Sequence, residues 1–450
     1  MENMKRKLFL TGLMLIAASA MFAQTRVCDE NADFNCFSIV AGKNATADGS
    51  VLFGHNEDDG PEYLVTMNVS EKGVWAEMPG MSVSDGYMNR YGVCIASDGC
   101  GSREDRDDYN EGGIVYELRL NVFLEAKTAK DALRIIARDM ERYGYRASGR
   151  TYVVTDPNEG WLVNVVKGHH WVAQRVPDDM VASVPNYYTI GRIDLSDTAN
   201  FAGSPDIVEY AVKRGWYDPK KDGEFNFRKA YANPNTLVSD HNVPRHKMVM
   251  EYLGTAYDID NVPFAIKADR KIDVRTMRKL LSLHRPERAD GSHPSGVCAF
   301  DTNVSTIFQL RSFMPLGIGC VAWTCQGKVC AEVHVPWYLG MTRSPEGYQR
   351  FGNVNDAIKK HFSDGTQKID GKGIRERYPD EKYWIYTDRW QNLLTDYSNL
   401  IVKRQAVINS IQEKIFNNQE KFEKKLLKMS PEKASEAMNK YTAKLVSEVE

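Results

Sequence analysis

The chain has 450 residues, of which 42% are hydrophobic and 26% are charged, and its formal net charge is −2. This composition is ordinary for a globular protein and sufficient for a large core. The near-neutral charge, and the lack of a Lys/Arg cluster interleaved with aromatic residues, argue against a nucleic-acid-binding surface.

The N-terminus has the pattern of a secretory signal peptide. Positive residues 5–7 precede a short apolar run at residues 8–18, and Ala20 and Ala23 follow as candidate cleavage points. The apolar run is too short to span a membrane comfortably, and no later run approaches ~20 residues. We expect residues 1–23 to be removed and the mature protein to be secreted or periplasmic, without a membrane span. An uncleaved anchor is the alternative.

The first predicted β-strand begins at a cysteine, Cys36. Residues 36–42 and 50–56 each suit a β-strand, and the Asn and Asp-Gly between them favour a turn, so this segment predicts a β-hairpin. With the turn centred near residue 45 or 46, Cys36 lies opposite a residue near position 55. His55 and Asp58 are therefore predicted to lie close to Cys36.

The rest of the chain predicts strands, then helices, then strands. This order favours an antiparallel α+β core rather than a doubly wound sheet. A capping box at Thr128–Asp131 predicts a helix start. From about residue 380 onward, apolar residues recur at helical spacing and predict two or three amphipathic helices packed on the body. The strands are expected at residues 92–97, 151–155, 161–166 and 181–184, with a hairpin of 318–324 and 328–335 around Gln326-Gly327.

The eight cysteines do not by themselves indicate a metal site. Cys320, Cys325 and Cys330 could be read as zinc ligands, but four residues separate each from the next, and a tight CxxC pair is lacking. Buried structural thiols are the favoured interpretation. There is no HExxH motif, so metal catalysis is not required.

A cysteine at the head of a strand has a specific chemical use. If the preceding residues are removed, Cys36 gains an α-amine with a reference pKa near ~8, which can take the proton from its own thiol. The thiolate then attacks a carbonyl, and the oxyanion needs fixed donors such as a backbone N–H and an Asn amide. The alternative is a small, buried apolar residue.

Residues 36–58 (CFSIVAGKNATADGSVLFGHNED) closely resemble the mature start of dipeptidase A-type cysteine peptidases, members of the N-terminal-nucleophile hydrolase superfamily. The resemblance continues in order to about Gly340. It implies a four-layer αββα sandwich of antiparallel sheets at residues 36–345, with a mostly helical C-terminal region at 346–450. The further matching segments are residues 88–93, 113–132, 171–191, 302–311 and 335–340.

The resemblance also implies roles for individual residues. Cys36 falls on the nucleophile, Asp58 on the carboxylate that holds the terminal amine, and Asn186 on the oxyanion-hole amide. Arg311 is expected to be the distal arginine of the site. Many relatives have arginine where this chain has His55, so the charge beside the thiol is expected to depend on pH.

The resemblance also implies autocatalytic maturation. The Cys36 thiol would attack the carbonyl of Asn35, and the polar, aperiodic residues 24–35 would leave as a propeptide.

Substrate recognition is expected to rest on charge near the nucleophile. Glu57 and Asp59, beside Asp58, are candidates for the substrate ammonium. Arg311, Arg192 and Arg90 are candidates for a substrate carboxylate, and Asn89 is a further candidate for substrate binding.

These features predict a broad-specificity dipeptidase acting on small peptides. No cofactor, metal or nucleic acid is expected, and the superfamily often forms homo-oligomers. Two alternatives remain. The first is an N-acyl amide hydrolase acting on conjugated bile acids, penicillins or N-acyl amino acids. The second is a catalytically silent binding protein with the same fold.

Overall fold

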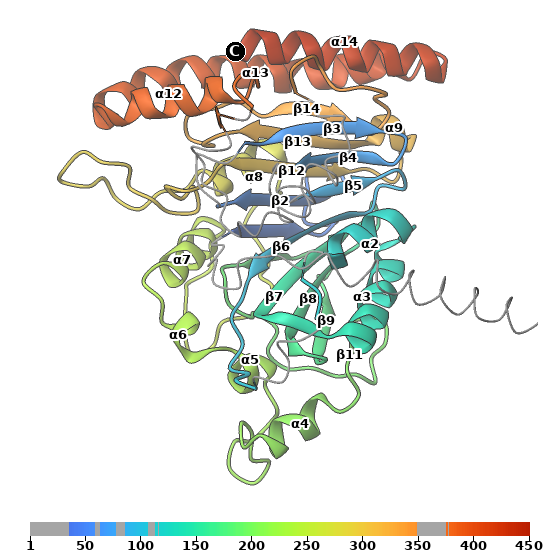
Figure 1. Cartoon of the computed structure of the whole chain (residues 1–450), viewed down its shortest axis with the longest axis vertical. Coiled ribbons are helices and arrows are strands. Elements are labelled where there is room, and N and C mark those ends of the chain that lie inside the picture. Colours follow the sequence, from blue (N-terminus) through green and yellow to red (C-terminus); the bar gives the residue numbers. More distant parts are fainter. Residues whose placement is uncertain are drawn as a thin grey trace, which may run out of the picture.

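The computed structural model describes residues 36–58, 64–77, 86–106, 113–115, 117–348, 375–376 and 378–450. The predicted signal peptide and propeptide, and Asp59, lie outside these residues. Two antiparallel sheets form the centre of the molecule (Figure 1). The six-stranded sheet has the order β10 (Val181–Val184), β1 (Phe37–Ala41), β2 (Val51–Glu57), β12 (Val304–Leu310), β13 (Cys320–Gln326) and β14 (Val335–Tyr338).

The second sheet has eight strands and packs face to face on the first. One face of it shares a core cluster with β1, β2 and β12, and the other face shares a separate cluster with two helices. The order is β11 (Phe201–Gly203), β9 (Trp171–Arg175), β8 (Gly160–Gly168), β7 (Tyr145–Thr155), β6 (Cys94–Gly99), β5 (Tyr87–Asn89), β4 (Gly73–Glu77) and β3 (Thr66–Ser70).

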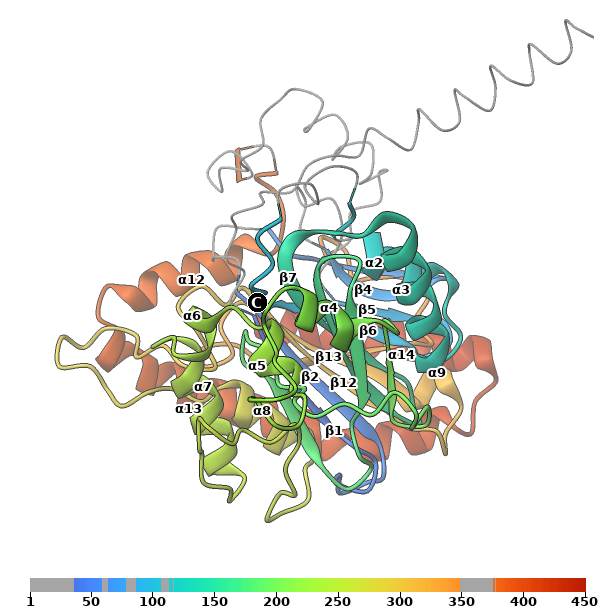
Figure 2. The ribbon, with the colours of Figure 1, turned by 90° about the horizontal axis from the view of Figure 1, so that it is seen from below.

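Helices cover both outer faces. α2 (Glu117–Glu125) and α3 (Ala129–Tyr143) pack on the eight-stranded sheet, and α8 (Val274–Leu281) packs on β2 and β12. Figure 2 shows α3 and α8 on opposite sides of the paired sheets. The predicted αββα layer order is therefore confirmed. The remaining shorter helices are α4 (Ile207–Lys213), α5 (Phe227–Tyr231), α6 (Pro234–Leu237), α7 (Asn242–Tyr252) and α9 (Leu316–Gly319).

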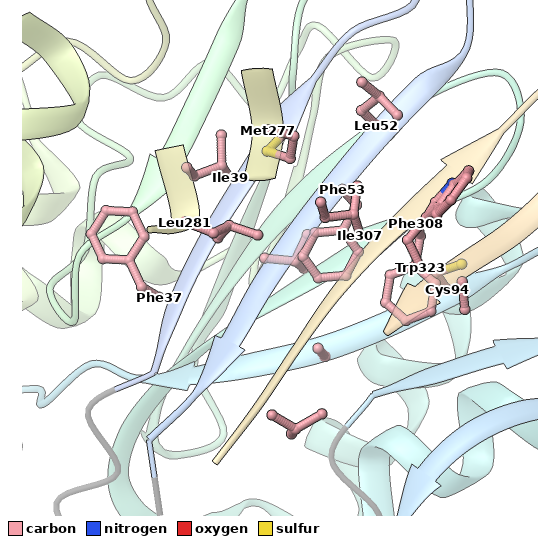
Figure 3. Packing of buried hydrophobic residues seen from close by; sticks show 14 of the residues in the cluster. Phe37, Ile39, Leu52, Phe53, Cys94, Met277, Leu281, Ile307, Phe308 and Trp323 are labelled. Carbon is pink, nitrogen blue, oxygen red and sulfur yellow. The ribbon is translucent and has the colours of Figure 1, made fainter. Parts of the chain in front are cut away.

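The hairpin strands β1 and β2 are buried along their whole length. Side chains alternate between faces, so one set points to the eight-stranded sheet and the other to α8. On the α8 side, Ile39, Met277 and Leu281 pack together (Figure 3). On the other side, Phe53 stacks on Phe308 with ring centroids 5.4 Å apart. Coverage of both faces explains why these strands show no polar alternation in the sequence.

The C-terminal helical extension is also confirmed. It consists of α12 (Trp384–Leu394), α13 (Tyr397–Leu426) and α14 (Pro431–Val449), which lie along the β13–β14 side (Figure 1). The Gln412 amide hydrogen-bonds both the backbone N–H and the carbonyl of His334, at 2.7 and 3.1 Å. Buried polar contacts of this kind fix the extension to the body. Within the described part of the chain, no helix has the length and apolar character needed to cross a membrane.

Two local predictions have different outcomes. Thr128 does cap α3, because its hydroxyl accepts a hydrogen bond from the Asp131 N–H at 3.0 Å. The predicted strand at residues 328–335 is wrong, because this segment forms turns and the partner of β13 is β14. The buried charges Lys328 and Glu332 bond outside the sheet, to Thr302 and to α12 and α13 arginines, so the segment cannot continue a hairpin.

Candidate active site

The register of the β1–β2 hairpin decides which side chains surround Cys36. Ser38 pairs with His55, so Cys36 at the head of β1 lies opposite Glu57, two residues beyond the predicted partner. A shift of two residues keeps the same face of the strand. Cys36, Ser38, His55 and Glu57 therefore all point between the two sheets.

The Cys36 thiol contacts a carboxylate. Its Sγ donates to Glu57 Oε1 at 2.8 Å, and the other carboxylate oxygen lies 3.2 Å from His55 Nε2. Cys36 is fully buried, and His55 and Glu57 are nearly so. Glu57, which the sequence suggested for substrate binding, is thus placed to accept the thiol proton.

Hydrogen-bond geometry indicates a cationic His55. Its Nδ1 lies 2.9 Å from Ser38 Oγ, and that hydroxyl donates to Asp98 Oδ2 on β6 at 2.6 Å. The Ser38 hydroxyl has one hydrogen, so it accepts from Nδ1–H while Nε2 faces the Glu57 carboxylate. Both ring nitrogens therefore face acceptors, which favours an imidazolium between Glu57 and Asp98.

Asp58 is held by an arginine that the sequence did not single out. Arg245 on α7 donates to Asp58 Oδ2 at 2.7 Å, and both side chains are completely buried. The Thr302 hydroxyl donates to the other oxygen at 2.5 Å. Burial raises the pKa of Asp58 to about 7, against the opposing effect of Arg245.

Asn186 lies on the other side of the nucleophile. Strand β10 pairs with β1 so that Val184 is opposite Ser38, which places residue 186 level with Cys36. Asn186 has φ 63°, and among the described residues it is the one non-glycine with positive φ. Asparagine tolerates this left-handed conformation better than most residues, and such strain is common at functional sites. Its amide accepts from Arg245 at 3.2 Å and donates to the Gly99 carbonyl at 3.2 Å.

The structure does not bring Arg311 to this site. It follows β12 at the end where Leu310 pairs with Val51, about 20 Å along the strands from Glu57. Its guanidinium binds both oxygens of Glu423 on α13, at 2.6 and 2.7 Å, and two backbone carbonyls. The structure thus places Arg245 at this site, whereas Arg311, the arginine expected there, contacts the C-terminal extension.

Two further candidates also have other partners. Asn89 is buried in β5, where its amide donates to the carbonyls of Phe123 and Ala126 and its oxygen accepts two backbone N–H groups. Arg192 is 73% exposed and pairs with Glu224 at 2.8 Å. Among the described residues, no contact joins either side chain to Cys36.

Sequence reasoning missed Arg245 because a single arginine in a helix has no distinctive pattern. Thr302 is the first residue of the segment 302–311, which resembles the family. That resemblance was the available sequence signal for Thr302. One Sγ, one imidazole nitrogen and one carboxylate oxygen from Cys36, His55 and Glu57 lie within 4.8 Å of one another, so these three side chains could also bind a metal ion.

Comparison with known proteins places the chain among peptidases. A model of peptidase family C69 matches residues 65–363, a span that begins after the Cys36 hairpin. The probable dipeptidase of Latilactobacillus sakei is 26% identical over 362 residues, covering 70% of this chain and 76% of that protein. Dipeptidase A of Lactobacillus helveticus is 25% identical, covering 71% and 78%. Among solved structures, the Caenorhabditis elegans orthologue of N-acylethanolamine-hydrolyzing acid amidase is 14% identical, with a TM-score of 0.34, covering 60% of this chain and 92% of that one.

Proposed function

Because the chain belongs to peptidase family C69, we propose that it is a secreted cysteine dipeptidase that matures by releasing the α-amine of Cys36. One observation carries the proposal. A buried thiol at the head of a central strand lies 2.8 Å from the Glu57 carboxylate, with Asn186 level with it on the neighbouring strand. The names of the two bacterial relatives, both dipeptidases, support the substrate class.

Each group then has a chemical task. The Cys36 amine, or Glu57 in its place, takes the thiol proton, and the thiolate attacks the peptide carbonyl. The Asn186 side chain, which contacts Arg245 and the Gly99 carbonyl, is the candidate amide for the oxyanion hole. The amine of the leaving residue takes a proton as the C–N bond breaks, which leaves a thioester on Cys36. Water then hydrolyses the thioester and restores the thiol.

Maturation uses the same thiol. In the precursor, Cys36 has no free amine, so the neighbouring Glu57 carboxylate is the base for the first cleavage. The thiolate attacks the Asn35 carbonyl, the Asn35–Cys36 bond breaks, and water releases the propeptide. In this scheme the Glu57 carboxylate is the base for maturation, and the amine released by maturation is available for peptide hydrolysis. Residues 1–23 would direct export, so cleavage follows or accompanies secretion.

The test compares wild type with Cys36→Ala by intact mass and by hydrolysis. We expect wild type to begin at Cys36 and Cys36→Ala to retain residues 24–35. Dipeptide hydrolysis should fall by at least about 10³-fold, because the covalent step is lost. Cys94→Ala is the matched control, since Cys94 is an equally buried thiol in the other sheet.

The substrate panel contains dipeptides, conjugated bile acids, penicillins and N-acyl amino acids. Preferential cleavage of the N-acyl compounds would replace the dipeptidase assignment with an amidase. Equal activity of wild type and Cys36→Ala would reject the nucleophile altogether.

A further inference from the structure

Four metal-ligating side chains meet away from the Cys36 cluster. His284, His293 and Cys298 lie on the connection between α8 and β12, and Cys330 lies in the turn after β13. Each offers one ligand atom, and these atoms all lie within 4.8 Å of one another. His293, Cys298 and Cys330 are buried, and His284 is half-buried. No other group of four such donors occurs in the part of the chain that the structure describes.

We propose that His284, His293, Cys298 and Cys330 form a structural Cys₂His₂ zinc site. Zinc prefers four tetrahedral nitrogen and sulfur ligands, with Zn–S about 2.3 Å and Zn–N about 2.0–2.1 Å. A tetrahedron of that size separates sulfur from nitrogen by about 3.6 Å. The distance from Cys330 Sγ to His293 Nε2 is 3.8 Å. The side chains thus already have the spacing of a zinc site.

Two imidazole nitrogens of the cluster have no hydrogen-bond partner among the described residues. His284 Nε2 and His293 Nδ1 are buried and make no hydrogen bond to any described residue. The two imidazoles are perpendicular, with ring centroids 4.6 Å apart, as two ligands of one ion can be. The unpartnered His284 Nε2 is available to a metal ion, whereas the His293 nitrogen that faces Cys330 is Nε2 and not the unpartnered Nδ1.

The cluster joins the body to the C-terminal extension. His293 meets the rings of Trp390 on α12 and Tyr397 on α13 edge to face, with centroids 5.2 Å away in both cases. These rings cover one side of the cluster with apolar surface. A zinc ion here would fasten two loops and the α12–α13 corner together.

The same loop supports the active site. The Val297 carbonyl, one residue before Cys298, accepts from Asn56 at 2.9 Å and from Arg245 at 3.4 Å. Thr302, four residues after Cys298, donates to Asp58. The zinc site therefore acts as a positioning element for Asp58 and Arg245, and it does not contact the substrate.

A Cys298–Cys330 disulfide is the competing arrangement, and secreted proteins do form disulfides. It would leave both imidazoles without a partner in a buried cluster. Zinc accounts for all four side chains, whereas a disulfide accounts for two.

Metal content of the purified full chain tests the proposal. Wild type dialysed against zinc should hold about one tightly bound zinc per chain by mass spectrometry. Cys36→Ala should hold the same amount, which excludes metal at the nucleophile. The double variant Cys298→Ser/Cys330→Ser should hold none, and Cys320→Ala, another buried thiol, should match wild type.

Two measurements on wild type avoid reliance on a variant that could fail to fold. Chelator treatment should lower the Tm, and added Co²⁺ should give the visible spectrum of a tetrahedral thiolate site. A zinc-free wild type after dialysis, or a Cys298–Cys330 disulfide in non-reduced peptide maps, would overturn the proposal. Because Cys36→Ala must keep its zinc, failure here is distinguishable from failure of the proposed peptidase activity.

Discussion

Two buried arginine–carboxylate pairs lie at opposite ends of the six-stranded sheet, and they serve different purposes. Arg245–Asp58 joins at 2.7 Å beside Cys36, and the same guanidinium binds the Asn186 amide. Arg311–Glu423 joins at 2.6 Å and otherwise binds only backbone carbonyls among its described contacts. Burial and pairing are alike in the two cases. The two pairs differ in the residues around them. Arg245–Asp58 lies beside the Cys36 thiol, whereas Arg311–Glu423 joins β12 to α13.

This comparison teaches that a buried ion pair is not in itself a sign of a catalytic site. Removing one partner of such a pair leaves the other charge buried and unpaired, which destabilises the folded protein wherever the pair lies. Only the pair that also positions reacting groups should change the kinetics of folded enzyme. Stability and activity measured side by side can therefore separate the two arginines.

The largest expected effect comes from replacing each arginine with methionine. Arg245→Met and Arg311→Met should each lower the free energy of unfolding by about 3–5 kcal/mol, since each leaves a buried carboxylate unpaired. Arg245→Met should in addition lower kcat/KM by about 10²-fold through misplacement of Asn186 and Asp58. Denaturant unfolding and steady-state kinetics, at a temperature where both variants are folded, give the two values. An equal loss of kcat/KM in Arg245→Met and Arg311→Met would show that the two ion pairs do not differ in their effect on catalysis.

A second prediction concerns pH. Burial raises the pKa of Asp58 from 3.8 to about 7, so the folded protein binds this proton more tightly than the unfolded chain. The stability from protonated Asp58 is therefore fully present below pH 3.8 and is lost as pH rises through about 7. Activity should follow the opposite course, because the anionic carboxylate is predicted to hold the Cys36 amine.

The measurement is Tm against pH for wild type and Asp58→Asn. Wild type should lose stability relative to the variant as pH rises toward 7. Burial also raises the pKa of Glu332 to about 7, so only the difference between the two proteins reports Asp58. Parallel curves would show that Asp58 does not titrate in this range.

The smallest expected effect is at His55. His55→Gln can keep a hydrogen bond to Ser38 but loses the cation, so kcat/KM should fall about tenfold. His55→Arg keeps a permanent charge, so its activity should decline less than that of wild type as pH rises above neutrality. Profiles of kcat/KM against pH for the three proteins check this. A wild-type profile identical to that of His55→Arg would mean that His55 is not titrating.

Much of the fold could be predicted from local signals. The hairpin begins at Cys36 because apolar strands flank a turn with Asp-Gly, and β10 occupies residues 181–184 as expected. The cap of α3 at Thr128 and the C-terminal helices also follow from short-range patterns. These features depend on residues close together in the chain, whose backbone preferences and periodicity are visible in the sequence.

Most of the elements, the layer order implied by family resemblance, and the position of Cys36 at the start of the hairpin could therefore be predicted from the sequence. Which side chains contact one another across long sequence distances depended on the tertiary structure. Arg245 lies 187 residues from Asp58, and Cys330 lies 37 residues from His293. A lone charged or metal-binding residue has no period or turn signature, so its role depends on which loops packing brings together. For the same reason, a two-residue shift in register placed Glu57, rather than His55, opposite the thiol.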